Sequence, residues 1–221
     1  MTRDRAKIPL LAVAALAVLA LALLGSACGG GGGDSTANSQ SGSEEQAAAV
    51  EGSYSGGEAT PPKAAPELKL DNYLGEPVDL AEYKGKAVLV TFIYDHCPDV
   101  CPLIVSHLKT AQAELGDKAK DMQIVAVSTD PRGDTPKTVA KFLDEHAMTG
   151  KMQYLIGSRP ELEKVWTHWN IVAKPAKANP DLVEHSALIY GIAANGKITT
   201  LYPANFAPSQ IVHDVPLLEQ Q

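Results

Sequence analysis

Cysteine is scarce in this chain of 221 residues: only three are present, at positions 28, 97 and 101. So few cysteines exclude a fold built on several disulfides and a structural zinc site of four thiolates. Basic clusters are also missing, and acidic residues (26) outnumber Lys and Arg (19), for a formal net charge of −7. Because phosphate neutralisation supplies most of the affinity for nucleic acid, we exclude a nucleic-acid-binding function. Apolar residues make up 45% of the chain, which allows a packed core.

Residues 1–27 have the pattern of an export signal. Three basic residues among the first seven precede an apolar run at 8–24 that has no polar side chain. Small residues then stand directly before Cys28, which resembles the lipobox of bacterial lipoproteins, where the signal is cut before the cysteine and the thiol is acylated. A leucine usually lies three positions before that cysteine, where this chain has Gly25. The pattern thus predicts lipidation of Cys28.

Two other forms of the amino terminus stay open. An uncleaved membrane anchor is one, since an apolar run of 17 residues lies at the short end of a membrane span. A fully released protein is the other. All three interpretations place the rest of the chain in an exported, oxidising compartment. We expect tethering to the outer face of a bacterial cytoplasmic membrane.

Residues 28–66 are predicted to be a disordered tether. Five glycines follow Cys28, and the rest is mostly Ser, Ala, Glu, Gln and Pro. Such a composition cannot bury enough apolar surface to order itself. A flexible chain of this length spans on the order of 35 Å. Its expected role is reach, so that the folded part can search the membrane surface for a partner.

Residues 67–221 are predicted to form one folded domain, without an internal repeat. Near-continuous apolar runs at 87–94 and 123–128 indicate strands buried on both faces. Further strands are expected at 153–156, 187–193 and 197–202, and helices at 103–115, 135–146, 160–169 and 208–218. Spacing also assigns five residues to the core rather than to a functional site: Met122, Met148, Met152, Trp166 and Trp169.

This order of elements predicts an α/β fold with a mostly parallel central sheet flanked by helices. An N-terminal β-hairpin turns at residues 75–77, and a late antiparallel hairpin turns at Asn195-Gly196. That is the outline of a thioredoxin-like fold. Sites in α/β sheets form beyond the carboxyl ends of the strands, and the segment that follows strand 87–94 contains two cysteines.

Cys97 and Cys101 can close a disulfide, or both thiolates can bind one metal ion. Their spacing puts both side chains on one side of a helical turn. We expect Pro102 at the first helical position and Cys101 at the cap, where the helix N-terminus favours the thiolate. A purely structural disulfide would stabilise little, because so short a loop removes little chain entropy. Two unrelated buried thiols are a further alternative.

Zinc in a structural site needs four ligands, and the domain has no other cysteine. A soft ion of low coordination number such as Cu(I) needs fewer; thiolates select it and imidazole is compatible with it. Among six histidines, His96 adjoins Cys97, but a sequence neighbour tends to point away. Four lie in predicted helices: His107, His146, His168 and His213. His185 stands just before strand 187–193 and could face the cysteines, although spacing alone leaves this open.

Three segments together resemble the Sco/SenC family. The run at residues 92–102 (FIYDHCPDVCP) is similar to the family signature, and so are the runs at 127–136 (VSTDPRGDTP) and 184–186 (EHS), in the family's order and spacing. The resemblance extends from about residue 68 to the end. The chain departs from the family at two places: Glu184 stands where Asp is common, and Arg132-Gly133 replaces the Glu-Arg of a loop that often reads Asp-Pro-Glu-Arg-Asp-Thr.

The resemblance implies a membrane-tethered, thioredoxin-like domain that binds copper, as Cu(I) or Cu(II), through Cys97, Cys101 and His185. It implies a metallochaperone or thiol reductant for the CuA centre of cytochrome c oxidase. The partner would be subunit II of that oxidase or another exported copper protein. In this hypothesis reduced thiols hold copper, and a Cys97–Cys101 disulfide excludes it. Asp130 is expected to orient the site from outside the ligand set, while Asp134-Thr135-Pro136 is interpreted as a helix start.

The main alternative is an enzyme, a metal-independent thiol–disulfide oxidoreductase with Cys97 and Cys101 as its catalytic pair. His185 separates the two, because a pure redox protein should tolerate its loss. A thiol peroxidase of the peroxiredoxin kind is disfavoured, since Tyr94 stands where that reaction wants Thr or Ser. A copper sensor or store stays open, because the sequence does not distinguish storage from delivery.

Overall fold

The structure is a computed structural model of the whole chain, and it describes residues 53–221. The predicted signal sequence, Cys28 and the first part of the predicted tether lie outside these residues. Across residues 53–221, no helix combines the length and the apolar character that a membrane crossing requires.

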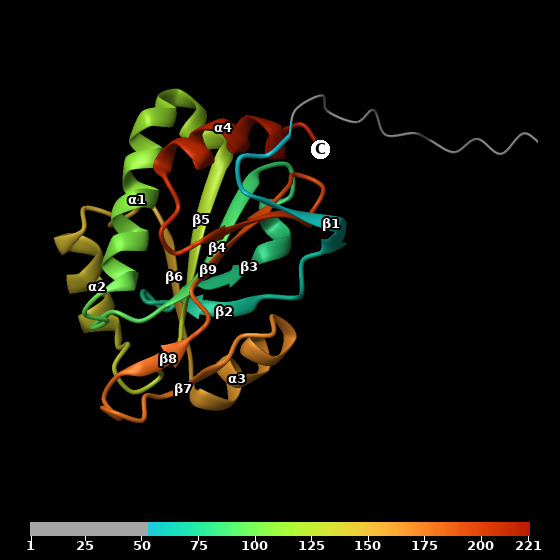
Figure 1. Cartoon of the computed structure of the whole chain (residues 1–221). Helices are drawn as coiled ribbons and strands as arrows, with labels where there is room; N and C mark the ends of the chain where they lie inside the picture. Colours follow the sequence, from blue (N-terminus) through green and yellow to red (C-terminus); the bar gives the residue numbers. More distant parts are fainter. Residues whose placement is uncertain (1–52) are drawn as a thin grey trace, which may run out of the picture. The chain divides into compact units, whose positions relative to one another are not determined.

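An eight-stranded sheet forms the centre of the domain (Figure 1), in the order β1-β10-β9-β4-β5-β6-β2-β3. Its middle strands β4 (Ala87–Ile93), β5 (Met122–Ser128) and β6 (Gln153–Ile156) are parallel. Both long apolar runs of the sequence are therefore central strands, as predicted. The central parallel strands with helices on both faces confirm the α/β, thioredoxin-like fold.

The outer strands pair antiparallel. β2 (Lys69–Asn72) and β3 (Pro77–Asp79) form the N-terminal hairpin, and β9 (Leu188–Ile192) and β10 (Lys197–Pro203) form the late one. Both hairpins confirm the prediction. β9 also pairs antiparallel with β4, and β2 with β6. The sheet is thus parallel only in its centre, because the hairpins at both sides reverse the chain direction.

The predicted tether was too long at its C-terminal end. Residues Gly57–Ala64 form strand β1, which pairs antiparallel with β10. This segment (GEATPPKA) is almost wholly exposed and carries two prolines, which are confined to edge strands or bulges. Its pairing with β10 shifts register between Glu58 and Lys63. An exposed edge strand lacks the apolar alternation by which a strand is recognised in sequence.

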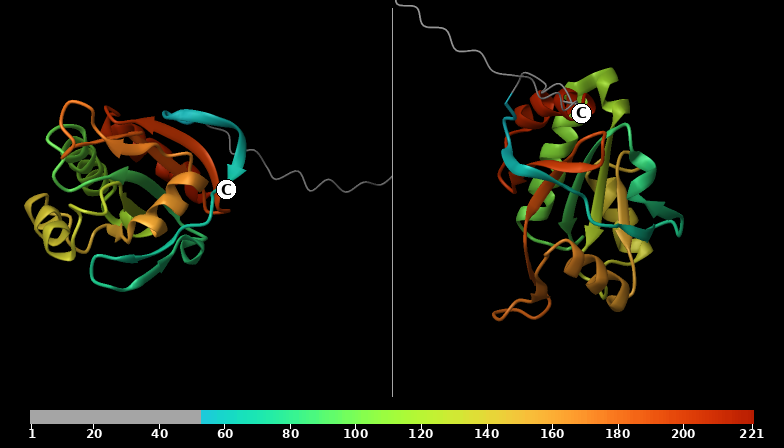
Figure 2. Two further views of the ribbon diagram at one scale, coloured as in Figure 1. Left: turned by 90° about the horizontal axis from the view of Figure 1, so that it is seen from below. Right: turned by 90° about the vertical axis from the view of Figure 1, so that its right-hand side faces the viewer.

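Helices cover both faces of the sheet (Figures 1 and 2), and each face has its own core. On one face pack α1 (Val100–Leu115), α2 (Pro136–Glu145) and α4 (Pro208–Glu219); on the other packs α3 (Arg159–His168). Strand β4 serves both cores. Leu89 and Ile93 face α1, while Val88, Val90 and Phe92 face α3. The five residues assigned to the core from spacing are all buried: Met122, Met148, Met152, Trp166 and Trp169.

Helix α1 begins earlier than predicted. Its cap residue is Asp99, so Cys101 and Pro102 lie inside the first turn rather than at the cap and the first position. The helix ends at Gly116, whose φ of 56° lies in the left-handed region that glycine adopts at little cost. Cys101 therefore points into the core beside the helix N-terminus.

A short hairpin that the sequence did not reveal carries His185. It consists of β7 (Ala173–Pro175) and β8 (Val183–His185), which pair antiparallel and form a sheet of their own. Figure 1 shows β8 at the end of the domain where α1 begins, and Figure 2 shows the connecting loop projecting away from the main sheet. His185 thus ends a strand rather than a loop, at the edge where the cysteines lie. Two 3₁₀ helices, at Leu80–Tyr83 and Gly116–Asp121, complete the described elements.

Candidate metal centre

The two cysteines lie where the chain passes from β4 into α1. Cys97 is half-buried in the turn before the helix, and Cys101 is fully buried in the first helical turn. Both are free thiols. The backbone N–H of Cys101 donates to the Cys97 sulfur at 3.5 Å. The free N–H groups of a helix N-terminus stabilise negative charge, so this position favours a thiolate at Cys97.

His185 reaches the cysteines from 84 positions away in the chain. Its Nε2 atom lies 3.7 Å from the sulfur of Cys101, and its Nδ1 lies 3.1 Å from the carbonyl oxygen of Ser186. A carbonyl only accepts, so Nδ1 carries the proton and Nε2 presents its lone pair to the sulfur. This is the tautomer that binds a metal through Nε2.

The pKa values of the two thiols are displaced in opposite directions. A hydrogen bond from the Cys101 thiol lowers the pKa of Cys97 to about 5; burial opposes this, while the backbone N–H groups of Asp99 and Cys101 and the Tyr94 hydroxyl support it. The same hydrogen bond, together with burial, raises the pKa of Cys101 well above its ordinary value. At neutral pH the reduced pair is therefore one thiolate and one thiol. Burial lowers the pKa of His185, which keeps its imidazole neutral.

Tyr94, the residue after β4, packs between His185 and His96. Its ring stands edge-on to His185, with centroids 5.7 Å apart, and to His96 at 4.9 Å. Burial raises the pKa of Tyr94 to about 12, with the charge of Cys97 as a further cause. The hydroxyl thus stays protonated and serves Cys97 as a donor rather than as a base.

Asp130 is buried at the carboxyl end of β5, but its contacts lie beside the thiols rather than on them. Its Oδ2 lies 3.4 Å from Nε2 of His96, and its Oδ1 accepts from the backbone N–H of Arg132 at 3.1 Å. Both ring nitrogens of His96 contact oxygen atoms, of Asp95 and of Asp181, rather than a cysteine sulfur. Its Nδ1 lies 2.9 Å from the carboxylate of Asp95. An orienting role of Asp130 would therefore act through His96 and Arg132 rather than by contact with the thiols.

Sequence reasoning missed Asp134, which supports the cysteine turn from beneath. Its Oδ1 accepts from the backbone N–H of Asp95 at 2.9 Å, and its Oδ2 accepts from the hydroxyl of Tyr154 at 2.9 Å. Burial raises the pKa of Asp134 to about 7. Helix α2 does begin at Pro136, but its cap is Thr135, whose hydroxyl accepts from the N–H of Thr138 at 3.2 Å.

A carboxylate in the segment that joins β5 to α2, at the edge where the cysteines were expected, was the available signal for Asp134. Asp95, whose backbone N–H donates to Asp134, is also incompletely hydrogen-bonded. Its Oδ2 is buried and has no hydrogen-bond partner. Buried polar groups are nearly always paired, so an unpaired carboxylate oxygen two residues before Cys97 marks an incompletely satisfied turn.

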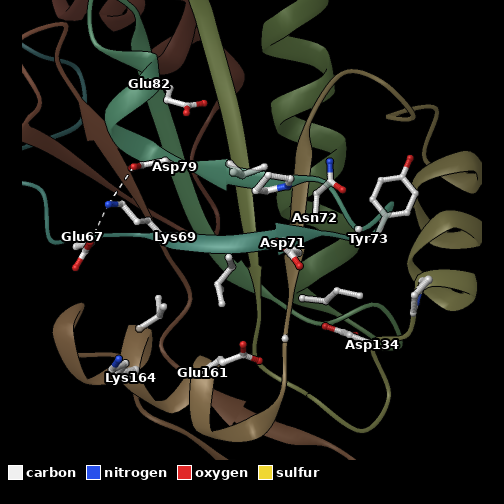
Figure 3. Close-up of a pocket in the computed structure, with 18 of the residues that line it drawn as sticks. Glu67, Lys69, Asp71, Asn72, Tyr73, Asp79, Glu82, Asp134, Glu161 and Lys164 are labelled. Atoms are coloured by element: carbon white, nitrogen blue, oxygen red, sulfur yellow. Dashed lines mark ion pairs between the residues drawn. The ribbon is translucent and has the colours of Figure 1, made fainter.

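A large cavity lies elsewhere in the domain (Figure 3). It has a volume of about 830 Å³ and lies between the β2–β3 hairpin and α3. Lys69 bridges Glu67 at 3.1 Å and Asp79 at 3.3 Å along its wall. Asp134 lines the cavity, but neither cysteine nor His185 does. Of the two sulfurs, only that of the half-buried Cys97 is partly exposed, because Cys101 is fully buried.

The fold and these side chains define the class: a thioredoxin-like protein with a dithiol and an imidazole converging at one edge of the sheet. The family model described as SCO1/SenC matches residues 57–218. The chain belongs to the SCO1/SenC family. The match begins at the residue where β1 begins.

Individual relatives agree. The chain is 30% identical over 152 residues to the SCO1 protein homolog of Bacillus subtilis, which covers 66% of this chain and 78% of that protein. It spans about half the length of the mitochondrial relatives that it matches.

Two solved structures are similar in fold and sequence. One is ScoI of Bradyrhizobium japonicum with copper bound, with a TM-score of 0.62 and 29% identity over 71% of this chain and 99% of that one. The other is BsSco, described as a member of the Sco family of cytochrome c oxidase assembly proteins with a disulfide switch. Its TM-score is 0.61, with 26% identity over 72% of this chain and 95% of that one.

Proposed function

We propose that this protein binds copper through Cys97, Cys101 and His185 and delivers it for assembly of cytochrome c oxidase. The observation that carries the proposal is the 3.7 Å approach of His185 Nε2 to the Cys101 sulfur, with the lone pair of that nitrogen facing the thiols. Membership of the family and the copper-bound relative support the choice of metal. The copper is cargo, so release matters as much as binding.

The donor set fits copper. Soft thiolates select Cu(I), and a neutral imidazole is a compatible third ligand. Cys97 is already a thiolate at neutral pH, because its pKa is lowered to about 5. Cys101 must lose its proton when copper binds, so binding couples to pH through that residue. A half-buried Cys97 leaves one ligand accessible to the thiols of a partner, and handover then proceeds by ligand exchange.

Redox state would control the cargo. When a partner disulfide accepts the electrons, the Cys97 thiolate attacks one of its sulfurs and releases the other as a thiolate. Cys101 then loses its proton, attacks the Cys97 sulfur of the mixed disulfide and releases the second partner thiolate. The two site thiols become a disulfide, the partner gains two thiols, and the site loses both sulfur ligands. The reduced partner is then ready to bind copper. The disulfide switch described for BsSco supports this coupling.

The client we propose is the CuA-bearing subunit II of cytochrome c oxidase, or another exported copper protein. Export through residues 1–27, lipidation of Cys28 and a tether up to about residue 56 would hold the domain at the outer face of the membrane. Radiolabelled palmitate tests the anchor. Label that is incorporated by the parent and lost in Cys28→Ser supports it, and equal label in both contradicts it.

Copper titration tests the proposed ligand set. Reduced protein is titrated with Cu(I) against a competing chelator, and the parent should bind one ion per chain. His185→Ala should weaken binding at least about tenfold, and the double variant Cys97→Ala, Cys101→Ala should abolish it. His168→Ala, an exposed histidine at the end of α3, is the matched control. Equal affinity of His185→Ala and the parent would defeat the proposal.

The lowered pKa of Cys97 favours one second candidate, a thiol–disulfide oxidoreductase that needs no metal. A thiolate at neutral pH and a buried partner thiol suit the two steps of exchange. Complementation separates the candidates. If cells that carry His185→Ala assemble the oxidase as well as those with the parent, dithiol chemistry is the function; if only the cysteine pair and His185 together restore assembly, copper delivery is.

A further inference from the structure

The loop that joins β7 to β8, residues 176–182, rests on two side chains from the other side of the site. Nε2 of His96 lies 3.1 Å from the carbonyl oxygen of Asp181, to which it donates. The guanidinium of Arg132 donates to the carbonyl oxygen of Pro180 at 3.3 Å. His96 follows β4, and Arg132 follows β5. Two loops of the main sheet thus hold the loop that leads directly into His185.

Asp130 contacts both of these donors, His96 and Arg132. It lies 3.4 Å from Nε2 of His96, and its other oxygen accepts from the backbone N–H of Arg132 and lies 3.9 Å from Nε of the same side chain. The opposite ring nitrogen of His96 lies 2.9 Å from the carboxylate of Asp95. The imidazole is therefore held on both edges, even though its side chain is 40% exposed.

Gly133 makes room for this imidazole. A Cβ at position 133 would stand 2.4 Å from Cε1 of His96 and 2.7 Å from Oδ2 of Asp130, closer than such atoms approach. Arg132 and Gly133 are also the two residues at which this chain departs from the usual family loop. Arg132 thus supplies one of the two donors, and Gly133 leaves space for the imidazole of His96, which is the other.

We infer that His96 and Arg132 are positioning residues that clamp loop 176–182 and thereby hold His185 against the thiols. The hairpin needs such support, because each of its strands has only three residues and isolated two-stranded hairpins are marginal in water. The role toward copper rests on the proposed function, whereas the clamp itself does not. The clamp therefore controls how readily His185 moves away from the thiols.

Amide hydrogen exchange in the reduced, metal-free full chain tests the clamp. Removing one of two such hydrogen bonds should speed exchange in residues 176–185 by about threefold to tenfold. This is expected for His96→Ala, for Arg132→Ala and for Gly133→Ala, which leaves both donors in the chain but displaces the imidazole. His96→Gln should restore most of the protection, since its amide N–H can donate to the same carbonyl.

Three controls keep this result interpretable. His168→Ala and Arg159→Ala remove exposed side chains of the same types from α3, and Gly57→Ala adds a Cβ at ordinary contact distance on edge strand β1. None should alter exchange in residues 176–185. Amides of β4 and β5 report whether a variant is globally destabilised. Unchanged exchange of the loop in all three clamp variants, with the core amides intact, would overturn the inference.

Copper transfer to a chelator separates the clamp from the proposed function. If His185 must leave before handover, the clamp variants should speed transfer by the same factor of about threefold to tenfold. In a His185→Ala background they should add nothing, which a merely structural role would not predict. Faster loop exchange with unchanged transfer would overturn the positioning role. If His185→Ala itself leaves copper binding intact, the proposed ligand set fails, and hydrogen exchange still decides the clamp.

Discussion

Asp214 and Asp95 both have buried carboxylate oxygens, but these oxygens differ in their hydrogen bonding. Asp214, fully buried in α4, accepts from the backbone N–H groups of Ser55 and Gly56 at 2.7 and 2.9 Å and from the hydroxyl of Tyr202 at 2.8 Å; His213 lies 2.7 Å away. We call these five residues the N-terminal anchor. They fix the start of the domain to its last helix, and both oxygens of Asp214 are paired.

The thiol site, which comprises Cys97, Cys101 and His185 with Asp95 and Asp134 beneath them, is less completely paired. Asp95 has a buried oxygen without a partner, and the pKa of Asp134 is raised to about 7. The pKa of Cys97 is lowered and that of Cys101 is raised. Burial alone does not distinguish the two regions. What differs is the pairing, because both oxygens of Asp214 accept hydrogen bonds whereas one buried oxygen of Asp95 has no partner.

Removing the anchor carboxylate should have the largest effect on stability. Asp214→Ala leaves the part-buried N–H groups of Ser55 and Gly56 and the buried hydroxyl of Tyr202 without their acceptor, and we expect the free energy of unfolding to fall by about 3–5 kcal/mol. Denaturant unfolding measures this, with the exposed Asp117→Ala as control. Alkylation of Cys97 in the folded variant should stay as in the parent. A loss under 1 kcal/mol would mean that the anchor contributes little to the fold.

The thiol site should respond in reactivity. In Cys101→Ala the main donor to the Cys97 thiolate is gone, so the pKa of Cys97 should rise from about 5 toward its ordinary value. The thiolate fraction at pH 6 then falls at least about tenfold, since each pKa unit is a factor of ten. The pH profile of iodoacetamide labelling measures it. Cys101→Ser retains a donor and should keep a lower midpoint than Cys101→Ala; equal midpoints in all three proteins would contradict the hydrogen-bond cause.

Asp134 should make stability depend on pH in a definite direction. Its pKa is raised in the folded state, so the folded protein binds more protons than the unfolded chain between about pH 4 and pH 7. Stability from this group is therefore present below pH 4 and is lost as pH rises through 7, by at most about 1.4 kcal/mol per pH unit. The difference between the parent and Asp134→Asn, taken from denaturant unfolding at pH 5, 6 and 7, isolates it from other groups. A difference that stays constant across this range would show that Asp134 is ionised throughout.

Regular periodicity accounts for what the sequence could predict. Strands β4 and β5 are continuous apolar runs, and the helices have apolar faces, so their bounds were found within a few residues. The cysteine pair followed from spacing and from its place after β4. In contrast, β1 is exposed and contains proline, so it lacks the pattern of a strand.

Contacts between loops could not be predicted in this way. His185 reaches Cys101 because a hairpin of three-residue strands returns to the sheet edge, and so short an element has no periodic signal. Only the family resemblance selected this histidine. Asp134 turns inward while Thr135 caps α2, a choice decided by the space beneath the cysteine turn. The fold was thus readable from local pattern, whereas the site depends on loop conformations that the tertiary structure decides.

The smallest effect is expected within the β7–β8 hairpin. Lys174 and Glu184 face each other across β7 and β8, with Nζ and a carboxylate oxygen 3.4 Å apart, but both side chains are about half exposed. Exposed ion pairs contribute under about 1 kcal/mol and weaken with salt. Lys174→Ala should therefore speed exchange of the β8 amides by less than about threefold. The effect should be smaller at about 0.5 M salt than at about 0.05 M, because salt screens the ion pair. If Lys174→Ala instead loosens β8 as much as His96→Ala does, the hairpin itself, rather than the side chains of the main sheet, holds His185 in place.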